Sequence, residues 1–347
     1  AGEGHSLALD DRGRLWAWGR NDRGQVGDGS FTPDVPLPYE LFPADPAKVF
    51  IEVAAGFDHS LAIDAGGLVW SWGSDMDGQL GNGPVLVGDQ PLPGPVSTAG
   101  GLQRAVRLAA GAFHGLALTA GGKVYGWGNN AEGSVGDGAP LPGSSVDTPM
   151  LAANIPGVPG ATALAAGGTH SLALQSEGRL LAWGGNASGQ LGIGTQQPVS
   201  APVMLNGVRL QGILATAGAW KQGYRLRADG TVWSWGENHE GQLGDGTQTP
   251  RHHAARVAGI DNVIAISANT SNLLALRSDG TVWGWGKNDH GQMGMPPGVG
   301  LGCPPAIATN VCVPMQIQAG LLTDVKALAA GTYFHLALKA DGTVWTW

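Results

Sequence analysis

The stretch HSLALDDRGRLWAWGRNDRGQVGDG, residues 5 to 29, contains the elements from which the whole chain is built. Two apolar runs, His5 to Leu9 and Leu15 to Trp18, flank a polar turn that contains Gly13. Such a pattern predicts a β-hairpin, because glycine accepts the positive φ that tight hairpin turns require. A Trp-Gly step then leads into a polar segment rich in Gly, Asn and Asp.

The same unit recurs along the sequence. The repeat is marked by tryptophans spaced 54, 55, 56, 52, 50 and 62 residues apart, at Trp18, Trp72, Trp127, Trp183, Trp235, Trp285 and Trp347. A further apolar run precedes most of the seven hairpins, and a weaker one follows them. About four strands per period predict an all-β, seven-bladed β-propeller of four-stranded antiparallel blades. The alternative, a β-solenoid, has shorter coils without a hairpin in each.

The segments after Trp-Gly carry a second signature, Gly-x-Asn-x-x-Gly-Gln. Matching stretches span 19–29, 73–83, 128–138, 184–194, 236–246 and 286–294, with Asp75 in the Asn position of the second and Ser134 in the Gln position of the third. With this signature the chain resembles the regulator-of-chromosome-condensation repeat family. The resemblance implies a seven-bladed propeller with one blade assembled from both chain ends. We therefore predict a single domain, 1–347, with repeats at about 1–48, 49–103, 104–160, 161–210, 211–260, 261–322 and 323–347.

The chain has seven hairpins but only six of these polar segments. We therefore expect it to be truncated at both ends relative to a closed ring, with the blade shared by the two termini incomplete. Ala1 opens directly into repeat sequence, so we expect that any signal peptide has been removed.

Charge and composition exclude several classes of function. The net charge is −8 and no run of Lys or Arg forms a basic stripe, so nucleic acid is not an expected partner. No apolar run is long enough to span a bilayer. Cys303 and Cys312 lie in one Pro-rich insertion and predict a disulfide, although two free thiols are the alternative. A disulfide favours a secreted, periplasmic or cell-surface location.

Most candidate site residues have a structural interpretation. Tryptophans two residues apart on a strand face the same side, so Trp18, Trp72, Trp127, Trp183, Trp235 and Trp285 are predicted to pack between blades. Histidines recur at one position in four repeats and are predicted to bond to neighbouring turns, with a metal site as the alternative; they are His5, His59, His114 and His170. In the other repeats this position holds Gln222, Asn272 and Phe334, and Phe cannot bind a metal. We predict no metal and no cofactor.

No catalytic residues are predicted. Ser-His neighbours such as His5-Ser6 lie within strands, where adjacent side chains point to opposite faces and cannot act together. Recognition is instead predicted in four insertions, 31–46, 84–102, 139–159 and 295–322, which are expected to emerge on one side. The predicted partner contacts are Phe31, Tyr39, Phe42, Leu86, Leu141, Leu301 and Ile307, together with Trp220, which lies off the repeat pattern. These insertions could instead only cap the propeller.

The sequence therefore favours a non-enzymatic protein–protein interaction or scaffold module, outside the cytoplasm and part of a larger assembly or surface structure, with an unknown oligomeric state. Two alternatives follow from the resemblance: a guanine-nucleotide exchange or chromatin-type regulator, and an inhibitor of a secreted enzyme such as a β-lactamase. A lyase-like enzyme would need an acid and a base at the propeller axis, and no such pair is identifiable.

Overall fold

The computed structural model describes residues 1–45, 47–84, 88–153, 160–176, 178–205, 212–297, 299–304, 309–318 and 321–347. Within these residues there are 26 named strands and no α-helix. The strands form seven antiparallel sheets, and the predicted seven-bladed β-propeller class is confirmed. The chain divides into two compact units: unit 1 is Ala1–Ser176, Leu181–Gly185 and Pro198–Val203, and unit 2 is Glu177–Leu180, Asn186–Gln197 and Met204–Trp347.

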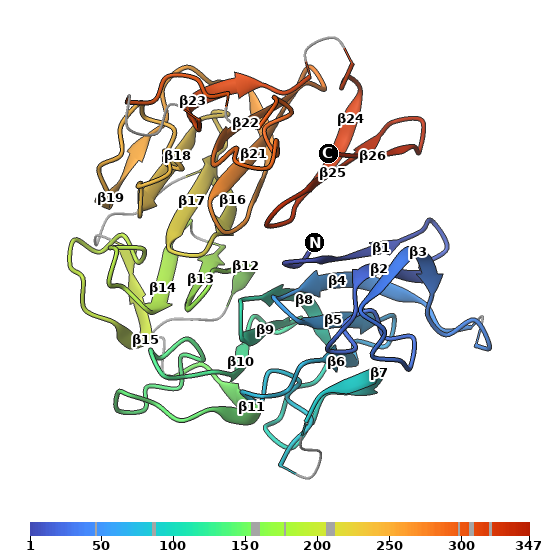
Figure 1. Cartoon of the computed structure of the whole chain (residues 1–347). Helices are drawn as coiled ribbons and strands as arrows, with labels where there is room; N and C mark the ends of the chain where they lie inside the picture. Colours follow the sequence, from blue (N-terminus) through green and yellow to red (C-terminus); the bar gives the residue numbers. More distant parts are fainter. Residues whose placement is uncertain are drawn as a thin grey trace. The chain divides into compact units, whose positions relative to one another are not determined.

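Unit 1 contains three sheets and nearly all of a fourth (Figure 1). In chain order the sheets are β1 (His5–Leu9), β2 (Leu15–Arg20) and β3 (Asp34–Glu40); β4 (Phe50–Ala55), β5 (His59–Asp64), β6 (Val69–Gly73) and β7 (Gln90–Pro95); β8 (Ala105–Ala110), β9 (His114–Thr119), β10 (Val124–Gly128) and β11 (Val146–Leu151); and β12 (Ala161–Ala166), β13 (His170–Gln175), β14 (Leu180–Gly184) and β15 (Val199–Met204).

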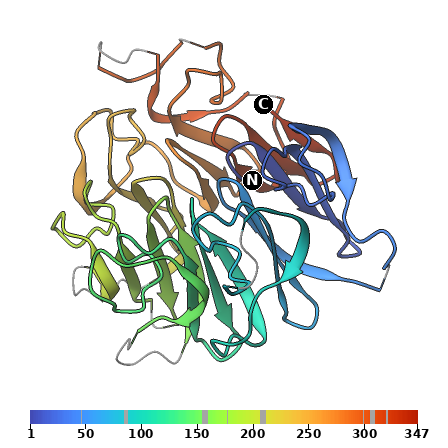
Figure 2. The ribbon, with the colours of Figure 1, turned by 60° about the horizontal axis from the view of Figure 1, so that its bottom comes forward.

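Unit 2 contains the other three sheets, which are drawn from yellow to red in Figure 2. The strands of each sheet are hydrogen-bonded in chain order. They are β16 (Ile213–Gly218), β17 (Gln222–Arg227), β18 (Val232–Gly236) and β19 (Arg251–Arg256); β20 (Val263–Ala268), β21 (Asn272–Arg277), β22 (Val282–Gly286) and β23 (Val311–Gln316); and β24 (Val325–Ala330), β25 (His335–Lys339) and β26 (Val344–Thr346). Each of the seven sheets falls within one of the sequence repeats.

Two of the sheets have three strands where five have four. The first sheet, β1–β3, has no counterpart of the first strand of the complete sheets, and the last, β24–β26, has no counterpart of the fourth. The sequence predicted one incomplete blade built from both chain ends. The described sheets show two incomplete sheets instead, and neither combines strands from the two ends of the chain.

The fourth strands correct the prediction of four loop-like insertions. β3, β7, β11 and β23 each lie inside one of those segments. Their prolines made these segments resemble loops in the sequence, because a proline cannot donate a hydrogen bond to the strand ladder. They tolerate proline because each is the edge strand of its sheet, bonded to a neighbour on one side only.

An indole joins each sheet to the one before it. The Nε1 of Trp72 on β6 donates to the backbone oxygen of Gln25, which follows β2, at 2.9 Å. The same bond occurs five more times, as Trp127 to Gln79 (2.9 Å), Trp183 to Ser134 (2.9 Å), Trp235 to Gln190 (2.8 Å), Trp285 to Gln242 (3.1 Å) and Trp347 to Gln292 (3.0 Å). Five of these rings are fully buried, and Trp347 is half-buried. Trp18, in the first sheet, is half-buried.

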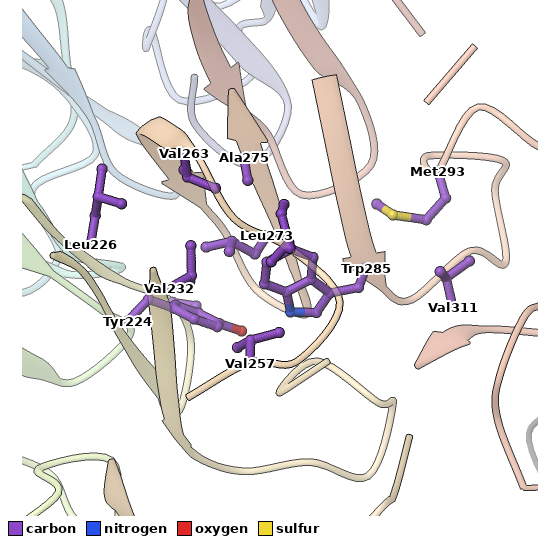
Figure 3. Packing of buried hydrophobic residues seen from close by; sticks show 12 residues of the cluster. Tyr224, Leu226, Val232, Val257, Val263, Leu273, Ala275, Trp285, Met293 and Val311 are labelled. Carbon is purple, nitrogen blue, oxygen red and sulfur yellow. The ribbon is translucent and has the colours of Figure 1, made fainter. Parts of the chain in front are cut away.

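Four of these indoles also belong to buried apolar clusters, namely Trp72, Trp127, Trp183 and Trp285. Figure 3 shows Trp285 beside Leu273, Val257 and Tyr224 in unit 2. The Tyr224 hydroxyl donates to the same Gln242 oxygen as the indole, at 2.7 Å. Burial of large aromatic rings whose polar atoms are all bonded is among the strongest packing contributions available to a sheet protein.

The second glycine of the Gly-Gln-x-Gly pattern in the polar segment is required because the indole of the next sheet lies against it. A Cβ added to Gly27 would lie 2.8 Å from the Nε1 of Trp72, and one on Gly81 would lie 2.7 Å from the Trp127 ring. Both glycines also have positive φ, 87° and 61°. The last glycine of the Gly-Gln-x-Gly pattern is therefore needed because any side chain there would clash with the next tryptophan.

We expect Trp72→Phe to lower the free energy of unfolding by about 2 kcal/mol, because it removes a buried hydrogen bond and leaves a small void. Chemical unfolding followed by circular dichroism measures the loss. The matched control is Trp16→Phe, a half-buried tryptophan of the first sheet. A loss no larger for Trp72→Phe than for the control would contradict the proposed role of the bond.

Candidate interaction surface

Two kinds of loop share one end of every complete sheet. One joins the first and second strands, and the other is the polar segment after the third strand. The hairpin turns and the connections to the next sheet lie at the opposite end, which we call the turn end. In unit 1 the first end consists of residues 2–4, 20–28, 56–58, 74–82, 111–113, 129–137 and 167–169, which we call the loop surface.

The polar segments are rigid turns built around one amide side chain. The Oδ1 of Asn21 accepts the backbone N–H of Val26 at 2.9 Å, and its Nδ2 donates to Asp28 at 3.0 Å. The same acceptor bond is made by Asn130, Asn186, Asn238 and Asn288. These contacts are those of turn-forming residues that bond their own backbone.

In the second sheet the asparagine and the aspartate of this turn exchange positions. Asp75 takes the place of the asparagine and accepts the N–H of Leu80 at 3.0 Å, while Asn82 takes the place of the aspartate and bonds to Asp75. Burial, with further contributions from nearby carboxylates, raises the pKa of Asp75 to about 6. Donor and acceptor are thus both kept, with their positions reversed.

Two of the repeated histidines, His5 and His114, contact serines of a neighbouring sheet, whereas neither ring nitrogen of His59 has a hydrogen-bond partner among the described residues. The Nε2 of His5 lies 2.8 Å from the Oγ of Ser60, which itself donates to the Gln25 oxygen at 2.8 Å. His114 and Ser171 repeat the contact at 2.9 Å. Glycines stand at the serine position in two other sheets, at Gly115 and Gly223.

Burial favours the neutral form of three of these histidines. The pKa of His59 is lowered to about 4, and those of His5 and His114 to about 3, chiefly by desolvation. Within the described ranges no group of three or more His, Cys, Asp or Glu side chains could hold a metal ion.

The loop surface is strongly acidic. It carries eight carboxylates against two guanidinium groups, whereas the corresponding loops of unit 2, residues 186–194, 219–221, 237–245, 269–271, 287–294 and 331–334, carry four carboxylates against two lysines. Arg20 is shared by Asp22 at 2.8 Å, Glu3 at 3.3 Å and Asp58 at 3.6 Å. Burial nonetheless raises the pKa of Asp58, with Arg20 opposing the shift.

An aromatic pair lies within this acidic surface. Phe57 and Phe113, from the first-to-second-strand loops of neighbouring sheets, pack edge to face with ring centroids 5.5 Å apart. Trp220 occupies in unit 2 the loop position that Phe57 has in unit 1. Sequence reasoning singled out Trp220 alone. The sequence feature that could have identified the two phenylalanines is their position between the glycine and the histidine of a recurring Gly-x-x-His pattern.

The predicted partner contacts fall at different places. Phe31, Leu141 and Leu301 precede fourth strands and are 51%, 36% and 47% exposed. Tyr39 lies on β3 and is 40% exposed. Leu86 and Ile307 lie outside the described residues.

Phe42 corrects the prediction that all four insertions emerge on one side. It follows β3 at the turn end and packs against Phe50 and Trp70, with ring centroids 5.3 and 5.4 Å apart. The prediction was wrong because each insertion contains a strand that runs from one end of its sheet to the other.

The predicted disulfide between Cys303 and Cys312 is present, with Cα atoms 4.9 Å apart. It closes the connection from β22 to β23. Within this connection the N–H of Leu301 donates to the Asn310 oxygen at 2.9 Å, and Asn310 donates through Nδ2 to Glu240 at 2.6 Å.

The buried histidines predict acid sensitivity. The pKa of His59 in the folded chain, about 4, lies below the ordinary 6.5, so the unfolded chain takes up the proton first. Stability is therefore complete at neutral pH and falls as the pH drops from about 6.5 towards 4. We expect His59→Gln, which copies Gln222, to reduce this loss by up to about 3 kcal/mol, measured by urea unfolding at pH 7 and pH 4.5. The partly exposed His252→Gln is the control, and equal losses in both variants would contradict the assignment.

Comparison with known protein families gives two matches. The family described as "RCC1-like domain" matches residues 1–298, and "Regulator of chromosome condensation (RCC1) repeat" matches residues 279–338. In the described part of the chain there is no helix able to cross a membrane.

Similar sequences and structures agree with these matches. Human "Probable E3 ubiquitin-protein ligase HERC6" is 30% identical over 99% of this chain, and "Ultraviolet-B receptor UVR8" of Arabidopsis thaliana is 28% identical over 72%. The matched regions span 33% and 55% of those relatives. Among solved structures, human WBSCR16 has a TM-score of 0.82 at 24% identity, covering 98% of this chain and 86% of its own, and Prp20p of Saccharomyces cerevisiae has 0.82 at 25%, covering 98% and 82%.

Proposed function

Because the chain belongs to the RCC1-like family of β-propellers, we propose that it is a protein-binding module without catalytic activity, and that its partner docks on the loop surface of unit 1. Propellers carry specificity in loops held by a rigid scaffold, and here the loops are fixed by side-chain to backbone bonds such as that of Asn21 to Val26.

One observation carries the proposal: the acidic loop surface contains a partly exposed aromatic pair, Phe57 and Phe113. Aromatic rings supply apolar contact area at the centre of an interface, while charges around them steer and orient the partner. With eight carboxylates against two guanidinium groups, the surface complements a partner whose contact face is basic.

The names of similar proteins support protein binding in general. Prp20p is described by its "Binding Properties to Gsp1p and Histones", and a second yeast structure, 22% identical, shows RCC1 (Prp20) bound to Kap60. The chain spans about a third of HERC6, so the ligase named for that protein gives no reason to assign this activity here.

We also propose that the module works in an oxidising compartment, such as the periplasm, the cell surface or the extracellular space. The support is the disulfide, which uses both cysteines of the chain. Such bonds persist mainly where thiols are not kept reduced.

The disulfide makes the compartment testable. Protein isolated from its source with immediate thiol blocking should carry no free thiol, and reduction should lower the free energy of unfolding by about 2 to 3 kcal/mol because the closed loop is short. The double variant Cys303→Ser/Cys312→Ser is the control and should not respond to reductant. Two free thiols in the fresh protein would reject the oxidising compartment and leave the binding proposal untouched.

A photo-crosslinking amino acid can test the docking surface. Met76 in the loop surface is 73% exposed, and Leu37 on the edge strand β3 is 74% exposed, so the two positions are equally accessible. We expect a cross-linker at position 76, but not at position 37, to trap one protein in the native source. A third cross-linker at Ile51, 51% exposed at the turn end, is the second control.

Charge should then govern the affinity for the trapped protein, measured with purified components. We expect binding to weaken at least about tenfold between 50 and 300 mM salt, and Asp22→Lys/Asp77→Lys to weaken it at least as much. Trapping at Leu37 or Ile51 instead, or an affinity independent of salt, would reject this surface.

A further inference from the structure

A small apolar pocket opens at the turn end of unit 1, away from the loop surface. Its volume is about 220 Å³. It is lined by the turn before β6 and by the connection from β7 to β8, and its lining includes Val69, Val96, Thr98, Leu102, Gln103 and Arg104.

The floor of the pocket is apolar and fixed. Val69, Val96 and Leu102 are 2%, 3% and 4% exposed and belong to one buried cluster. Backbone bonds hold the two lining segments together: the N–H of Val96 donates to the Val69 oxygen at 2.9 Å, and that of Ala105 to the Gly67 oxygen at 3.0 Å. The pocket therefore exists before any ligand arrives, which reduces the entropy that binding costs.

The mouth of the pocket is polar. Thr98, Gln103 and Arg104 are exposed, and none of these three side chains has a hydrogen-bond or ion-pair partner among the residues that the structure describes. An apolar floor with a few unengaged polar groups at its rim is the usual composition of a small ligand site.

Arg104 is held in a backbone conformation that arginine rarely adopts, with φ at 53°. The equivalent residue faces the hairpin-turn glycine of the preceding sheet in two other sheets, and there it is Asn262 or Asp324, each with φ at 58°. Asn and Asp tolerate this region, whereas arginine costs about 1 kcal/mol more. Strain of this kind is found preferentially where a side chain serves a purpose other than folding.

We propose that this pocket binds the carboxyl terminus of a partner protein that ends in a branched aliphatic residue. The aliphatic side chain would enter the pocket and lie against Val69, Val96 and Leu102. Arg104 would form an ion pair with the terminal carboxylate. A guanidinium matches a carboxylate through two parallel N–H donors, which gives direction as well as affinity.

The size and the rim narrow the ligand class. Pockets that enclose drug-sized molecules have about 300 to 1,000 Å³, so this one accepts a single side chain and not a cofactor. Thr98 and Gln103 offer donors and acceptors that a terminal peptide group can use. Because the pocket lies at the turn end, this proposal stands or falls separately from docking on the loop surface.

The test uses the full chain and three probes: the peptide acetyl-Gly-Gly-Leu with a free carboxylate, the same peptide with a C-terminal amide, and 4-methylpentanoate. Methyl NMR shifts of Val69, Val96 and Leu102 report occupancy. We expect saturable shifts with the acid peptide and at least about tenfold weaker binding of the amide. No saturation with the acid peptide, or equal binding of acid and amide, would overturn the proposal, and binding of 4-methylpentanoate alone would indicate a small-molecule site instead.

The variant Arg104→Gly separates binding from folding. Glycine accepts the positive φ, so the variant should have an equal or higher melting temperature while binding of the acid peptide falls at least about tenfold. Asn262→Gly makes the matched change at the equivalent position of another sheet and should leave binding unchanged. Wild-type binding by Arg104→Gly would reject the role of Arg104.

Discussion

The hydrogen bond from an indole N–H to a backbone oxygen of the preceding sheet is the interaction on which the rest of the structure depends. The indole is buried, so its N–H must find an acceptor, and the Gln25 oxygen and its equivalents provide it. The acceptor must then be held in place, which the Asn21 bonds to the polar segment achieve. Because the ring lies against this segment, Gly27 cannot carry a side chain.

This arrangement explains why so many polar residues of the chain have structural roles. Asn21, Gln25, His5 and Ser60 each make a hydrogen bond within a turn or to a neighbouring sheet. The exchange of Asp75 and Asn82 shows that the requirement is for one donor and one acceptor, whichever residue supplies each. A scaffold satisfied in this way leaves recognition to residues that the repeat does not use, such as Phe57, Met76 and Arg104.

The two proposed recognition sites differ in physical character. The loop surface combines carboxylates and an aromatic pair, and suits a large basic face through long-range attraction and central apolar contact. The pocket beside Arg104 is small and apolar, with a single cation at its rim, and suits one side chain with one negative charge. Since the two sites occupy opposite ends of the sheets, one module could engage both without competition.

The sequence by itself determined the hairpins and the number of sheets, because the glycine turns and the Trp-Gly spacing are local or periodic features. It predicted the disulfide from two nearby cysteines but left free thiols as the alternative, and the structure shows the bond. It predicted a weak fourth strand per repeat but did not place β3, β7, β11 and β23 inside the four insertions, because their strand character comes from a neighbour across the ladder. Only the tertiary structure decided that Phe42 lies at the turn end, that Phe57 meets Phe113, and that Arg104 borders a pocket. Each of these facts depends on contacts between residues distant in sequence, which no local pattern encodes.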